Sequence, residues 1–250
     1  MSGFRSIAVG LVLATILHVL SGGRAAASDF FGPSQGLQLQ PELDVIEGVG
    51  QTFRLVGKFE PTWTPSASND VLGFSLYADW LVAPFLGPIV TPDHAKRHRL
   101  DVRVGISWYP TVSQGSVGWS NLLQLEAEAT NRTTIPGEIL ATVRSRVEAQ
   151  WELDEPTGFT WRLRIRPQLE REFVISHEGG TSLTPFANVE FIWTTSRDMW
   201  AQFRMQAGLQ LSVDWFGKGQ VIELSGSVFT YLQPSRSHSP VIGAVWYQYF

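Results

Sequence analysis

The chain contains no cysteine and only three lysines among its 250 residues. Without cysteine no disulfide can form, so the folded state depends on packing and strand pairing. The chain also lacks a linker, a low-complexity run and any break in composition that would divide it into domains. One long apolar run is present, residues 7–20, and it is shorter than the ~20 residues that a membrane-spanning helix needs. Any membrane insertion must therefore use strands.

The N-terminal segment is ordered like a secretory signal. Arg5 supplies a positive start, residues 7–20 are apolar, and residues 25–27 are alanines of the kind that a signal peptidase accepts. We expect cleavage after this triplet, which makes residues 1–27 a signal peptide and residues 28–250 a single exported domain; an uncleaved anchor is the alternative. Cleavage removes two arginines and no acidic residue, so the formal charge of −4 becomes −6. That balance gives no reason to expect nucleic acid as a partner.

Segments with a period of two follow one another through the exported part. In residues 159–175, for example, Trp161, Leu163 and Leu169 alternate with polar and charged residues, whereas a helix would spread such residues around its circumference. The same pattern recurs between short clusters of glycine, proline, serine, asparagine and aspartate. The eleven expected strands are residues 37–46, 52–63, 71–82, 100–110, 119–132, 139–153, 159–175, 185–194, 199–215, 221–232 and 241–250.

These segments predict an all-β fold, a single antiparallel transmembrane β-barrel of ten to twelve strands. Single-chain bacterial barrels usually have an even strand number, so ten or twelve is expected rather than eleven. Pro41 and Pro61 weaken the first two segments, because proline cannot donate a hydrogen bond to a central ladder. Residues 83–97 form either a long loop or a further strand.

The apolar face could line a ligand cavity, as in a soluble lipocalin-like barrel, or contact lipid. Three features favour lipid: a last strand that carries Trp246 and ends in Phe250, tryptophans near strand ends, and a polar face that uses arginine rather than lysine, with 16 arginines against three lysines in the whole chain. Trp246 and Phe250 are typical of the signal that the barrel-assembly machinery reads. On this interpretation Leu163 and Leu209 face lipid, while Arg164 and Gln210 face the lumen. The tryptophans concerned are Trp63, Trp108, Trp119, Trp151, Trp161, Trp200, Trp215 and Trp246.

The C-terminal half also carries a family resemblance. The matching runs are RLRIRPQLEREF (residues 162–173), LTPFANVEF (183–191), AGLQLSV (207–213) and VIGAVWYQYF (241–250). They resemble a family of Gram-negative outer-membrane β-barrels known only as a domain of unknown function. The resemblance covers roughly residues 138–250. It implies a barrel in the outer membrane, in contact with its lipid, and brings no established activity.

The most distinctive polar feature is a set of alternating charges in the predicted lumen. Opposite charges adjacent across antiparallel strands stabilise a sheet by roughly 0.2–1 kcal/mol per pair. We therefore favour a structural ladder over an anion-selective or substrate-guiding pore surface, since a barrel of about ten strands leaves little free bore. The expected lumen residues are Arg144, Arg146, Glu148, Glu152, Arg162, Arg164, Arg166, Glu170, Glu172 and Arg204.

Evidence for other activities in the sequence is weak. A membrane-embedded lipid hydrolase would need a serine and a histidine that act together, but adjacent Ser176 and His177 point to opposite faces of a strand. His238 lies among three serines in residues 233–239, a polar loop that needs no catalytic explanation. Residues 93–99 hold two histidines and one aspartate among three basic residues, which oppose a metal ion. We expect no enzyme activity and no cofactor.

Overall fold

The computed structural model describes residues 37–50, 52–63, 69–82, 100–113, 119–154, 158–176, 180–195, 199–213, 219–232 and 237–250. The predicted signal peptide and the uncertain segment 83–97 lie outside these residues. The described part consists of strands and turns. It contains no helix long and apolar enough to cross a membrane.

Twelve strand segments make up this part of the chain, and ten of them run for twelve residues or more. Their bounds are β1 Gln38–Val49, β2 Phe53–Thr62, β3 Asn69–Leu81, β4 Leu100–Ser113, β5 Trp119–Ile135, β6 Ile139–Glu152, β7 Phe159–Arg171, β8 Phe173–Ser176, β9 Thr181–Thr194, β10 Met199–Val213, β11 Gln220–Tyr231 and β12 Ser237–Tyr249. Most of the strands expected from the sequence are recovered with ends that differ by a few residues.

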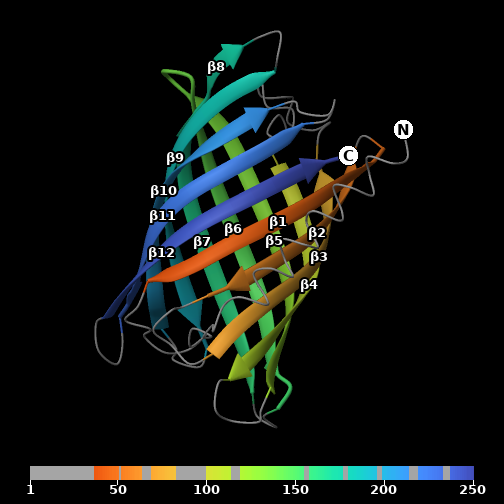
Figure 1. The fold of residues 1–250 in the computed structure, drawn as a ribbon, viewed down its shortest axis with the longest axis vertical. Helices are drawn as coiled ribbons and strands as arrows, with labels where there is room; N and C mark the ends of the chain where they lie inside the picture. Colours follow the sequence, from red (N-terminus) through yellow and green to blue (C-terminus); the bar gives the residue numbers. More distant parts are fainter. Residues whose placement is uncertain are drawn as a thin grey trace.

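The strands close into a barrel in which neighbours in sequence are neighbours in space (Figure 1). The short β8 continues the line of β7 beside β9, so the described residues form a ring of eleven strands rather than ten or twelve. All pairs are antiparallel except the closing pair, β1 with β12, which is parallel. The parallel pair is a consequence of the odd number, because reversing direction at each of ten steps gives the first and last strands the same direction. The predicted all-β barrel of ten to twelve strands is confirmed, whereas the even number expected within that range is wrong and the closing pair departs from the antiparallel order.

The predicted strand 159–175 is interrupted at Glu172. Up to Arg171, β7 pairs with β6 along one edge and with β9 along the other. The β6 ladder ends at the pair Ile139–Arg171, and beyond it β8 pairs with β9 alone. Loss of a partner on one edge explains why the regular strand stops there.

Pro41 and Pro61 lie within strands, although proline cannot donate a hydrogen bond to a central ladder. The β1–β2 register is constant from the pair Val49–Phe53 to Leu43–Phe59, and the isolated bridge Leu39–Trp63 keeps it. In this register Pro41 stands opposite Pro61. Each lacks the N–H that would bond the other's carbonyl, so the gap in the ladder leaves no backbone donor without a partner.

The strands run obliquely to the long axis of the barrel (Figure 1). From Asp44 on β1 the register leads through β2 to β6 and reaches Thr160 on β7. In the other direction it leads through β12, β11, β10 and β9 to Val174 on β8. Thr160 and Val174 lie fourteen residues apart on the continuous edge formed by β7 and β8. A register that returns displaced by this amount requires strands tilted to the barrel axis. The midpoint of this fourteen-residue stagger is residue 167 of β7. This residue therefore lies across the barrel at the same height as Asp44.

The outer surface is apolar and the interior is polar. Leucine, valine, isoleucine and phenylalanine side chains are exposed on every strand from β1 to β12, and Leu209 keeps 49% of its surface exposed. Trp63, Trp108 and Trp161 are exposed toward one end of the barrel and Trp80 and Trp246 toward the other. The apolar core inside is correspondingly small, a cluster formed by Ile46, Val56 and Tyr77 with Tyr247 and Tyr249 packed against it.

Candidate functional site

The lumen contains a cavity of about 380 Å³ whose lining is mostly polar. Arg164 and Gln210 line it, whereas their sequence neighbours Leu163 and Leu209 do not and lie on the opposite face of their strands. Ten basic and six acidic side chains contribute to the lining. All five tyrosines of the chain also line it, consistent with a wet interior in which phenol groups find polar partners.

Six arginines form one side of the cavity, which we call the arginine cluster. They are Arg144 and Arg146 on β6, Arg162, Arg164 and Arg166 on β7, and Arg204 on β10. The β6–β7 register places Arg144 opposite Arg166 and Arg146 opposite Arg164, so these strands align like charges at two successive lumen positions. Only Glu148, opposite Arg162, gives the alternation of opposite charges expected from the sequence.

The carboxylates that compensate these arginines come mainly from the flanking strands. On β5, Glu126 lies 2.7 Å from Arg146, and Glu128 lies 2.7 Å from Arg146 and 3.2 Å from Arg144. On β9, Glu190 accepts two hydrogen bonds from Arg164, at 2.8 and 3.1 Å. Such two-point pairing is the geometry in which a guanidinium binds a carboxylate most strongly.

Glu148 is the most deeply buried member of this network, with none of its side-chain surface exposed. It lies 3.0 Å from Arg164, 3.5 Å from Arg162 and 3.7 Å from Arg146. A buried carboxylate without such partners would be strongly disfavoured, so these four side chains fix one another's positions.

Four carboxylates do not balance six arginines, and the excess falls on Arg166 and Arg204. Within the described part of the chain, Arg166 makes no hydrogen bond or ion pair. Arg204 donates a hydrogen bond to Ser227 at 3.0 Å and lies 4.7 Å from the centre of the Phe229 ring, and it pairs with no described carboxylate. Both guanidinium groups line the cavity.

The opposite side of the cavity is acidic. This acidic cluster consists of Glu42 and Asp44 on β1, Glu60 on β2 and Glu223 on β11, with Lys58 of β2 among them. The Lys58 ammonium lies 2.9 Å from Glu42 and 2.8 Å from Glu60. Glu223 accepts a hydrogen bond from Gln210 at 2.8 Å. One carboxylate oxygen of Asp44, Oδ1, is buried without a hydrogen-bond partner among the described residues.

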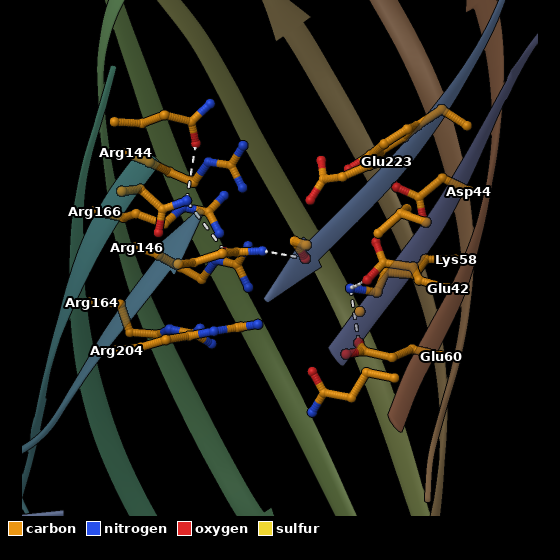
Figure 2. Close-up of a pocket in the computed structure, with 18 of the residues that line it drawn as sticks. Glu42, Asp44, Lys58, Glu60, Arg144, Arg146, Arg164, Arg166, Arg204 and Glu223 are labelled. Carbon is orange, nitrogen blue, oxygen red and sulfur yellow. Dashed lines mark hydrogen bonds and ion pairs between the residues drawn. The ribbon is translucent and has the colours of Figure 1, made fainter. Parts of the chain in front are cut away.

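The two clusters face each other at the same level of the barrel. In a ring of eleven strands, β6 and β7 are the strands farthest from β1. β6 is the fifth strand from β1 in one direction, and β7 is the fifth in the other. The register stagger brings residue 167 level with Asp44, beside Arg166. Figure 2 shows the arginines on one side of the lumen and Glu42, Asp44, Lys58, Glu60 and Glu223 on the other. The lumen is therefore polarised across its width.

A third charged group lies nearer the end of the barrel where β3 ends. Asp79 is held by Arg103 at 2.6 Å and Arg54 at 3.3 Å, and Asp101 pairs with Arg132. These side chains are paired with one another across neighbouring strands, which makes this group mainly a structural one.

The residues predicted for the lumen are brought together only in part. Glu148 lies behind the arginines, and Glu152 and Glu172 are half-buried at strand ends outside the cavity lining. Glu170 accepts a hydrogen bond from Gln168 at 2.6 Å. The predicted residues that line the cavity are Arg144, Arg146, Arg162, Arg164, Arg166, Glu170 and Arg204.

Sequence reasoning missed Glu126, Glu128 and Glu190, although a signal for them was present. All three occupy polar positions of strands that follow or precede β6 and β7 in the chain, so antiparallel neighbours would have brought them next to the arginines. The acidic cluster was missed because its members lie on β1, β2 and β11, which become neighbours only when the barrel closes.

The last strand presents Ile242, Trp246 and Phe250 on the outer surface. The Phe250 N–H donates a hydrogen bond to the Ile46 carbonyl at 2.9 Å, which ties the end of the strand to β1. Tyr247 faces the lumen instead. Recognition of this strand by an assembly machinery stays a prediction.

The residues considered for a hydrolase or a metal site are mostly outside the described residues, including His94, His98 and His177. His238 is described, and its Nδ1 lies 3.1 Å from the Thr230 hydroxyl. The described residues contain no group of three histidine or acidic side chains arranged to hold a metal ion.

Comparisons with known proteins add little. No family model and no curated protein sequence matches the chain. One similar solved structure is that of the β domain of the Bordetella autotransporter Brka, at 14% identity and a TM-score of 0.44, covering 81% of this chain and 83% of that one. The resemblance to a family of Gram-negative barrels stays a prediction, and the interpretation of this chain rests on its own geometry.

Proposed function

We propose that this chain is an outer-membrane β-barrel that forms a narrow channel for small polar solutes. The observation that carries the proposal is a closed barrel with an apolar outer surface around a charged cavity of about 380 Å³. Closure gives each of the eleven long strands of the described ring a neighbour on both sides, which is the condition for strands to cross a bilayer.

The outer surface supports the membrane location. A soluble monomer rarely exposes contiguous apolar patches larger than a few hundred Å², and here large apolar side chains are exposed on every long strand of the described ring. Strands of ten to seventeen residues are long enough for a tilted crossing, which needs about 9–11. Exposed tryptophans toward both ends fit the two headgroup regions. The export signal expected in residues 1–27 agrees with this location.

The cavity supports a channel over a barrel with a purely structural lumen. The buried carboxylates Glu126, Glu128, Glu148 and Glu190 favour the structural interpretation, since they bind four of the arginines tightly. Among the described residues Arg166 makes no hydrogen bond or ion pair, Arg204 pairs with no carboxylate, and Asp44 keeps one carboxyl oxygen without a hydrogen-bond partner; all three line free volume. A lumen with a purely structural role does not require polar groups without partners beside free volume.

The orientation is tested by one outward and one inward substitution on β10. Leu209→Arg places a charge in lipid, which costs on the order of 2 kcal/mol, whereas Gln210→Leu only removes a lumen hydrogen bond. We expect Leu209→Arg to reduce the folded, heat-modifiable form in the outer-membrane fraction more than Gln210→Leu does. The opposite order would indicate a soluble barrel.

The channel itself is tested by the swelling of proteoliposomes in solutes of increasing size. We expect glycerol-sized solutes to enter and trisaccharides to be excluded. Swelling no faster than that of empty liposomes would contradict a channel and leave the structural barrel.

A further inference from the structure

We propose that the cavity selects small zwitterionic solutes, molecules of amino-acid size that carry one carboxylate and one ammonium group. The carboxylate binds at the arginine cluster and the ammonium at the acidic cluster. This inference rests on the proposed channel function and names the solute class of the same cavity.

The binding groups for the carboxylate are Arg166 and Arg204. The neighbouring carboxylate Glu190 is bound at two points by Arg164, so it leaves these two guanidinium groups uncompensated. Arg204 is held in place by Ser227 and by the Phe229 ring. A guanidinium group fixed in this way binds a carboxylate without first having to be ordered.

The ammonium binds at Asp44, which lies two residues from Glu42 on β1. Asp44 has an unpartnered carboxylate oxygen although only 6% of the residue is exposed, and it lines the cavity. Lys58 pairs with both Glu42 and Glu60, so a single ammonium faces two carboxylates and Asp44 lies beside them. Negative charge is therefore left over here, as positive charge is left over on the facing side.

Both clusters act on one solute through the field between them, because they face each other at the same level of the lumen (Figure 2) and orient a dipolar molecule with its carboxylate toward the arginines. A volume of 380 Å³ has room for about a dozen water molecules, which is enough for an amino acid with part of its hydration shell. A zwitterion exchanges water for opposite charge at both ends. A simple cation or anion is attracted by one cluster and repelled by the other, and a neutral molecule gains neither contact.

The test compares alanine with lactamide, which have the same atoms and nearly the same size but differ in charge separation. Proteoliposomes containing the full barrel are transferred to each solute and their swelling rates are measured, with empty liposomes subtracted. We expect alanine to enter about five times faster, the ratio that one charge contact of about 1 kcal/mol produces.

Substitutions then identify the residues that cause the preference for alanine over lactamide. Arg166→Gln combined with Arg204→Gln, and separately Asp44→Asn, should bring the alanine-to-lactamide ratio close to one. The matched controls are Arg171→Gln on β7 and Glu47→Gln on β1, exposed positions on the outer face, and they should keep the wild-type ratio. Heat-modifiable mobility verifies that each variant is folded, and the isosteric Asp44→Asn remains informative if the double arginine variant misfolds.

The outcomes separate this inference from the channel proposal. Equal entry of alanine and lactamide through the wild-type barrel would overturn zwitterion selection and keep the channel. Entry of neither would contradict the channel and the inference together. A preference for alanine that survives in Asp44→Asn and in the arginine variant would show that other residues select the solute.

Discussion

The β1–β2 and β6–β7 hairpins face each other across the lumen and hold their charges in different ways. The β6–β7 ladder has thirteen consecutive pairs, and three of its five cavity-lining arginines, Arg144, Arg146 and Arg164, are bound by carboxylates from the flanking strands. The β1–β2 ladder has seven consecutive pairs, a proline gap and one isolated bridge, and one lysine serves several carboxylates. The comparison shows that a dense cluster of like charge is tolerated where neighbouring strands supply counter-charges, and that surplus charge collects where they supply fewer.

The largest effect should follow from removing a central partner in the β6–β7 hairpin. Arg164→Ala leaves both Glu148 and Glu190 without their shortest ion pair. We expect a loss of about 3 kcal/mol in the free energy of unfolding, the low end for a buried pair because 21% of the arginine side chain is exposed. Urea unfolding in lipid, followed by tryptophan fluorescence, measures it.

A substitution on the same strand provides the control. Arg171 pairs with Glu138 at 3.5 Å, and both side chains are exposed, so Arg171→Ala should change stability by only about 0–1 kcal/mol. Equal losses for the two variants would mean that the lumen network is as well hydrated as the surface, and the contrast between the hairpins would disappear.

A smaller effect is expected in the β1–β2 hairpin from Lys58→Met. The substitution leaves Glu42 and Glu60 without their cation, beside Asp44. We expect a loss of about 1–2 kcal/mol at neutral pH, because the carboxylates lose a partner but retain access to lumen water. Acidification should recover part of the loss in this variant, since protonated carboxylates no longer repel one another. Lys58→Arg should behave like the wild type, and a loss that does not depend on pH would argue against repulsion as its cause.

The smallest effect concerns the proline gap. Pro61→Val supplies an N–H that can donate a hydrogen bond to the Pro41 carbonyl, which stabilises the fold by about 0.5–1.5 kcal/mol. The substitution also increases the conformational entropy of the unfolded chain, which destabilises the fold by about 0.4–1 kcal/mol. The net change in unfolding free energy should therefore stay within about 1 kcal/mol. Hydrogen exchange of the β1 and β2 amides is the more sensitive measurement, and we expect slower exchange near the gap. Unchanged exchange would mean that the two strands do not approach closely there.

Much of the fold followed from the alternation in the sequence. The strand segments, the outward direction of Leu209 and the inward direction of Arg164 and Gln210 depend on a period of two, which each strand carries in its own residues. The parallel closure, the interruption at Glu172 and the pairing of Pro41 with Pro61 depend on which strands are neighbours and in which register. Those properties belong to pairs of segments and have no signal within either one.

The alternation of residues within each segment was sufficient to predict strands with one apolar and one charged face, and to assign residues to each face. The tertiary structure decided that the charges are sorted across the lumen, with arginine surplus on β7 and β10 and acidic surplus on β1, β2 and β11. The physical reason is that the stagger of a closed barrel sets which residues stand level with one another. Asp44 and Arg166 are more than a hundred residues apart in the chain, and only closure of the ring brings them to opposite sides of one cavity.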